Sequence, residues 1–132
     1  WRVITATYIV EKTYENWIAS IKDIVGNNYS MENSTIVSSL PYASMYFVGL
    51  PSEGMDFEKN ESGVVATVQI DIFSNGQKAV SSAYSIDEKS HSAMTKMGYE
   101  RIQGPEMIQN IDPSIKRLTS RYRRTFGYDD TL

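Results

Sequence analysis

Apolar residues recur at helical spacing in two stretches of the chain, which predicts two α-helices. The first stretch spans residues 14–25, and its apolar face consists of Tyr14, Ile18, Ile21 and Val25, widened by Trp17 and Ile24. The second spans residues 77–97, and one face carries small and apolar residues at Ala79, Ala83, Ile86, Ser90, Ala93 and Met97. The small residues would let this helix lie close to a sheet.

The first ten residues, WRVITATYIV, contain two conflicting signals. Their β-branched residues favour a strand. Ile4 and Tyr8, however, continue the apolar face of the first helix backwards. We therefore expect this stretch to be helical as well.

Four other segments have the composition or alternation of β-strands. These segments are residues 42–50, 64–73, 99–102 and 118–126, and the second of them, VVATVQIDIF, alternates most clearly. The resulting order is α-β-β-α-β-β. It predicts a single α+β domain over residues 1–132, with a mostly antiparallel four-stranded sheet and two helices packed on one face.

The connection at residues 51–63, PSEGMDFEKNESG, is long and acidic. It contains Pro, two Gly and four carboxylates, at Glu53, Asp56, Glu58 and Glu61. It exceeds the length of a tight hairpin, and connections of this length are often functional. We expect a protruding acidic loop or hairpin.

A basic run near the C-terminal end balances this acidic segment. Residues 114–127 hold five cationic residues and no carboxylate: Lys116, Arg117, Arg121, Arg123 and Arg124. The formal net charge of the chain is -3, so the remainder holds eight bases against sixteen acids. The charge is therefore segregated along the sequence, and any contact with phosphate would be local, since a chain that binds nucleic acid over its whole surface is usually basic.

Read as a strand, the basic run has two different faces. Leu118, Ser120, Tyr122, Arg124 and Phe126 form a mainly core-like face, and Arg117, Thr119, Arg121, Arg123 and Thr125 form a polar one. If this strand pairs with residues 64–73, Gln69 and Asp71 lie opposite the arginines. Two interpretations remain open. The face is solvated with one or two cross-strand pairs, or it meets the acidic 53–61 segment of a neighbouring copy.

No set of residues predicts catalysis, a metal site or a cofactor. There is no cysteine and only one histidine, His91. Ser90, Ser92 and Asp87 are near His91 in sequence, but that proximity does not make a triad. Asp71 is a lone strand carboxylate, for which a cross-strand charge pair is favoured over a general base. We find no apolar run of membrane-spanning length and no signal peptide, and we expect a protein that is not an enzyme.

Four segments together resemble a known family. They are PYASMYFVGLPSEGMDFEKNES, ATVQIDIFSNGQKA, AMTKMGYERIQGPEMIQN and IKRLTSRYRRTFG. An aromatic strand, an acidic loop, a VQIDIFS-like strand, a helix ending in MGY and a basic-aromatic strand follow one another. The chain thus resembles, over roughly residues 40–127, the tail terminator or tail-completion (neck terminator) proteins of long-tailed bacteriophages.

This resemblance implies a structural virion protein that forms a hexameric ring. The ring would cap the tail tube, stop its polymerisation and join the tail to the head-closure or connector complex. The implied partners are further copies of the chain, the tail-tube protein, a neck protein and, in contractile phages, the sheath protein. The genome would pass through the channel without sequence-specific binding, and the particle would assemble in the bacterial cytoplasm.

Arginine lining a channel would slow DNA through phosphate contacts. We therefore expect the arginine row at an interface between subunits or along the tail axis. The alternatives are another neck component, such as a head-closure or adaptor protein, a nucleic-acid-binding module that uses the basic strand and Tyr122, and a small hydrolase that uses His91 and a serine.

Overall fold

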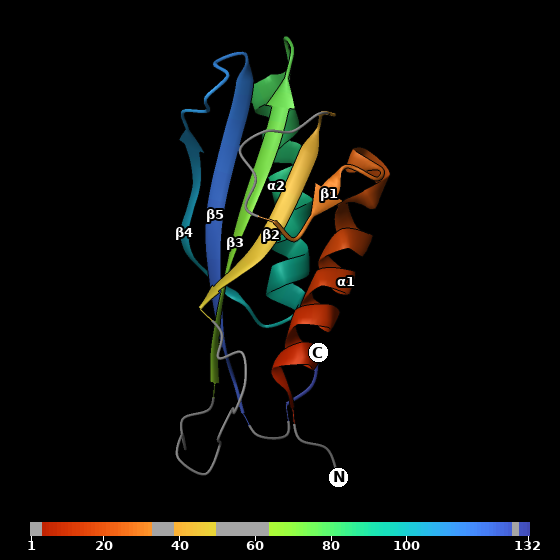
Figure 1. The fold of residues 1–132 in the computed structure, drawn as a ribbon, viewed down its shortest axis with the longest axis vertical. Coiled ribbons are helices and arrows are strands. Elements are labelled where there is room, and N and C mark those ends of the chain that lie inside the picture. The colour runs from red at the N-terminus through yellow and green to blue at the C-terminus, as the bar shows by residue number, and fades with distance from the viewer. Residues whose placement is uncertain (1–3, 33–38, 50–63, 128–129) are drawn as a thin grey trace.

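A computed structural model describes residues 4–32, 39–49, 64–127 and 130–132. Its elements, in chain order, are α1 (Ala6–Val25), β1 (Tyr29–Ser30), β2 (Tyr42–Gly49), β3 (Val64–Asn75), α2 (Ala79–Lys96), β4 (Glu100–Ile108) and β5 (Ile115–Phe126). The strands form one sheet in the order β1-β2-β3-β5-β4. Both helices cover the same face of this sheet (Figure 1). The predicted α+β class is confirmed.

The sheet has five strands within the described residues, so the prediction of four was wrong. The additional strand, β1, pairs parallel to β2, whereas the other pairings are antiparallel. It lies in a segment rich in Asn and Ser, whose side chains compete with regular backbone hydrogen bonding. The pairing begins where the amide of Ala43 donates to the carbonyl of Asn28 at 3.1 Å. A two-residue strand is too short to produce a periodic sequence signal, and the true order is α-β-β-β-α-β-β.

Strand β4 is longer than expected, and β5 begins earlier. The predicted strand 99–102 extends to Ile108, and the predicted strand 118–126 starts at Ile115. Gly104 and Pro105 are residues that usually interrupt a strand, and the register of β4 shifts on both sides of Gln103. An edge strand tolerates such a break because one side of its backbone needs no partner.

Helix α1 begins earlier than the strongest part of its apolar pattern. Thr5 caps it, since the Thr5 hydroxyl accepts from the amide of Tyr8 at 3.1 Å. The helical interpretation of the first ten residues is therefore confirmed from Ala6 onward, while residues 1–3 lie outside the described part. Gly26, at a φ of 62°, closes the helix in a backbone conformation that glycine adopts readily.

One core fills the space between the helices and the sheet. Trp17 on α1 and Tyr122 on β5 are fully buried at its centre. Ala93, expected to face inward, is only partly buried, and Met94 occupies the buried position instead. Apolar spacing therefore located the buried face of α2 to within one residue.

Candidate interaction surface

Strand β5 has the two faces that its alternation predicts. Leu118, Ser120, Tyr122 and Phe126 are buried toward the helices. The other face lies on the side of the sheet that the helices leave uncovered (Figure 1). We call its three cationic residues, Arg117, Arg121 and Arg123, the arginine row.

Arg117 is already committed to a partner within the sheet. Its guanidinium lies 3.0 Å from an oxygen of Asp71 and 5.4 Å from the ring centre of Phe73. Asp71 is fully buried, and the Arg117 side chain is 14% exposed. The expected cross-strand role of Asp71 is therefore present. Because a buried pair of this kind is costly to break, Arg117 is a poor candidate for contacting another molecule.

Arg121 and Arg123 are the exposed part of the arginine row. Arg121 lies opposite Gln69 in the register of β3 and β5 and donates to the Gln69 side-chain oxygen at 2.9 Å. Arg123 lies opposite Thr67 and Glu100. Within the described residues Arg123 forms no ion pair, although the exposed Glu100 is its neighbour on β4.

The two remaining cationic residues of the basic run lie outside this row. Lys116 is exposed at the start of β5, opposite Ser74. Arg124 points to the helix side, where its guanidinium lies over the ring of Phe126 at 4.2 Å and donates to the backbone oxygen of Met97. The Arg124 side chain is 17% exposed.

The acidic half of the predicted interface cannot be compared with the basic half. Glu53, Asp56, Glu58 and Glu61 lie in residues 50–63, outside the described part of the chain. Their proposed contact with the arginine row stays a prediction.

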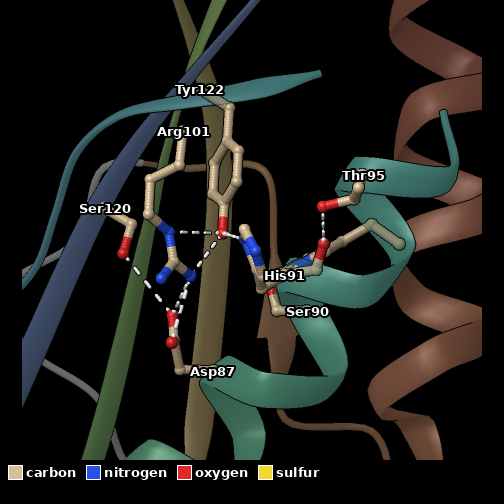
Figure 2. A network of polar contacts seen from close by, with 8 residues as sticks. Asp87, Ser90, His91, Thr95, Arg101, Ser120 and Tyr122 are labelled. Atoms are coloured by element: carbon tan, nitrogen blue, oxygen red, sulfur yellow. Dashed lines mark hydrogen bonds and ion pairs between the residues drawn. The ribbon is translucent and has the colours of Figure 1, made fainter. Parts of the chain in front are cut away.

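A buried polar network joins α2 to the sheet, and the sequence did not reveal it. Arg101 on β4 holds the carboxylate of Asp87 on α2 in a two-point ion pair, at 2.9 and 3.0 Å (Figure 2). The same guanidinium donates to the hydroxyl of Tyr122 at 2.9 Å. Ser120 lies 3.5 Å from Asp87. Both contacts come from one nitrogen of the Arg101 guanidinium. Hydrogen bonds between charged groups are stronger than those between neutral ones, so the network fixes β4 and β5 against the helix.

His91 lies at the outer end of this network, where its Nδ1 is 3.1 Å from the Tyr122 hydroxyl (Figure 2). Arginine can only donate, so the Tyr122 oxygen accepts from Arg101 and its own proton is free to go to His91. That arrangement assigns the neutral His91 its proton on Nε2. Burial raises the pKa of Tyr122 to about 12, and the nearby Arg101 opposes this rise.

The residues required by the hydrolase alternative do not form a triad. Ser90 accepts a hydrogen bond from the indole of Trp17 at 2.8 Å, inside the core. Asp87 is engaged with Arg101, and His91 with Tyr122. A triad needs a histidine between the nucleophile and the acid, and these contacts connect neither pair.

Metal and membrane signals are also absent from the described residues. No group of three or more His, Asp or Glu side chains there could hold a metal ion. Among the helices described, none is sufficiently long and apolar to cross a bilayer.

Comparison of the chain with models of known protein families gave no match, and comparison with curated proteins gave none either.

Proposed function

We propose that this chain is a ring-forming tail or neck terminator of a long-tailed bacteriophage, and thus a structural protein of the virion. Its ring would cap the tail tube, stop its growth and join it to the head-closure complex. The order of sequence segments between residues 40 and 127 suggests this family. The observation that carries the proposal is the exposed pair Arg121 and Arg123 on a sheet face without helices, where neither guanidinium forms an ion pair within the described residues.

In this proposal the contact between neighbouring subunits is electrostatic. Arg121 and Arg123 of one copy face the acidic residues 53–61 of the next. When two different patches of the same chain bind each other, the subunits associate head to tail. Such subunits form a closed ring if the rotation from one to the next divides a full turn evenly. Charges across such a contact set register and speed association. Because exposed charges are screened over about 8 Å at physiological salt, assembly should weaken as ionic strength rises.

The test is charge reversal at the exposed arginines. The variant Arg121→Glu/Arg123→Glu should keep its fold by circular dichroism but remain a monomer by native mass spectrometry, and it should no longer cap purified tail tubes. Lys12→Glu/Lys22→Glu provides the control, because it makes the same change in net charge on exposed positions of α1. Normal ring formation and capping by the arginine variant would disprove the subunit contact. A wild-type protein that neither binds tubes nor enters particles would disprove the terminator role.

The burial of Tyr122 disfavours the nucleic-acid-binding alternative. Stacking on Tyr122 would require an accessible ring, whereas Tyr122 is fully buried.

A head-closure or adaptor role uses the same exposed surface. It is distinguished by the partner, since such a protein would bind the portal side of the neck rather than the end of the tail tube.

A further inference from the structure

A groove of about 820 Å³ lies between α1 and α2 and extends to the end of β5. We call it the helix groove. Its volume is in the range of pockets that accept ligands. Short side chains from both helices leave this space open: Ala19 and Ser20 on α1, and Ser92 and Ala93 on α2.

The charged side chains that line the helix groove are all cationic in the described part of the chain. They are Lys89, Lys96 and Arg124. The described lining residues include no aromatic ring and no acidic side chain. In a chain with a net charge of -3, this makes the groove a local positive region with a small-residue floor.

Two of these cations can reach a ligand without loss of a strong contact. Lys89 pairs with Asp23 at 2.7 Å, but both side chains are largely exposed, at 45% and 67%. Exposed pairs are worth little, so another carboxylate can replace Asp23. Lys96 forms no ion pair within the described residues. Arg124, in contrast, is held in place at the groove end by the carbonyls of Met97 and Thr131, and it lies 3.9 Å from a carboxylate oxygen of Asp130.

The spacing of the two lysines defines the ligand further. Lys89 and Lys96 are seven residues apart on one helix, or about 10.5 Å along its axis. Carboxylates seven residues apart on a second helix, aligned with α2, would match both ammonium groups. A helix whose small or apolar face enters a groove is a common mode of peptide recognition.

We propose that the helix groove binds an acidic amphipathic helix of a partner protein. The floor accepts its small or apolar face, and Lys89 and Lys96 contact its carboxylates. The absence of an aromatic ring from the described lining disfavours single-stranded nucleic acid, which usually stacks its bases on such rings. This proposal does not depend on the terminator role or on the arginine row.

The experiment uses two labelled peptides of about 18 residues, roughly five helical turns, rich in Ala and Leu. One has Glu at seven-residue intervals, and the other has the same composition with Glu distributed over all faces. Fluorescence anisotropy should show that the first binds at least ~10-fold more tightly, a difference of about 1.4 kcal/mol. Lys96→Glu and Ala19→Phe should each weaken this binding by a similar factor. Lys116→Glu, on the exposed start of β5, should leave it unchanged.

Several results would overturn the proposal. These are equal affinity for the two peptides, no binding at about 1 mM peptide, and unaltered binding by the folded Lys96→Glu and Ala19→Phe variants. Self-association that Lys96→Glu abolishes would assign the groove to a second copy of the chain. A labelled single-stranded DNA of about 20 nucleotides, roughly the site of one to a few small binding modules, that displaces the peptide would assign it to nucleic acid.

Discussion

The ion pair between Arg101 and Asp87 allows the sharpest prediction about stability. We consider Arg101→Met, which keeps most of the side-chain length but removes the charge. The Asp87 carboxylate, 7% exposed, would then retain only the contact with Ser120 at 3.5 Å. The hydroxyl of Tyr122 would also lose its donor.

Breaking a buried pair from one side costs about 3–5 kcal/mol. The Arg101 side chain is 18% exposed, so water can reach part of the vacated site, and we expect the lower end, about 3 kcal/mol. For a chain of 132 residues, about 4 °C per kcal/mol corresponds to a fall in Tm of about 12 °C. This is a large share of the roughly 5–15 kcal/mol that stabilises a typical domain.

Urea unfolding followed by circular dichroism measures the free energy of unfolding for three proteins in parallel. They are the wild type, Arg101→Met and the double variant Asp87→Leu/Arg101→Met. Apolar side chains of similar volume can replace a buried pair at little cost, so the double variant should be more stable than the single one. Lys89→Met serves as the control. It removes an exposed pair with Asp23 and should cost less than about 1 kcal/mol.

Two results would refute this reasoning. In the first, Arg101→Met costs no more than the Lys89→Met control. In the second, the double variant is as unstable as Arg101→Met or less stable, which would mean that the unpaired Asp87 carboxylate was not the source of the loss.

Two further predictions concern β4 and the tyrosines. Gly104→Ala should destabilise the protein by about 3 kcal/mol, from a positive φ and overpacking together, because the new Cβ would lie 2.5 Å from the backbone oxygen of Thr119. Gly76→Ala, at a similar φ but with no atom within 4 Å, should cost about 1 kcal/mol in the same denaturation assay, and equal costs would contradict the steric argument. Burial raises the pKa of three tyrosines to about 12, namely Tyr46, Tyr99 and Tyr122. Since these pKa values are raised on folding, the stability they contribute is complete below pH 10 and is lost as the pH rises toward 12. Absorbance titration of the folded protein should show this group ionising after the exposed tyrosines, and a single transition near pH 10 for all of them would contradict it.

The arginine row shows which features of β5 can be predicted from the alternation of residues alone. Period-two spacing separated Leu118 from Arg117. A pairing with residues 64–73 would place Gln69 and Asp71 opposite arginines, and the register pairs Gln69 with Arg121 but Asp71 with Thr119. The alternation did not show that Arg117 lies in a buried ion pair, whereas Arg123 forms no ion pair within the described residues. That difference depends on what packs over each side chain, which lies outside the repeat of a single strand.

The polar network around Arg101 and Asp87 could not be predicted from the sequence, for a related reason. Arg101 looked like the end of a short strand, and Asp87 looked like a neighbour of the single histidine. The two are fourteen positions apart, and nothing in helix or strand periodicity connects them. They meet because β4 pairs with β5 so that Arg101 lies opposite Tyr122, on the sheet face that α2 covers.

The sequence by itself determined the two helices, the buried faces of the strands, the α+β class and the segregation of charge, because these follow from local spacing and composition. The tertiary structure decided which charges are buried and which remain available. Only there do Asp71 and Asp87 acquire their arginine partners, and only there do short side chains on α1 and α2 form a groove lined by Lys89, Lys96 and Arg124. The physical reason is that the cost of a charge depends on its surroundings, and segments distant in the sequence supply those surroundings.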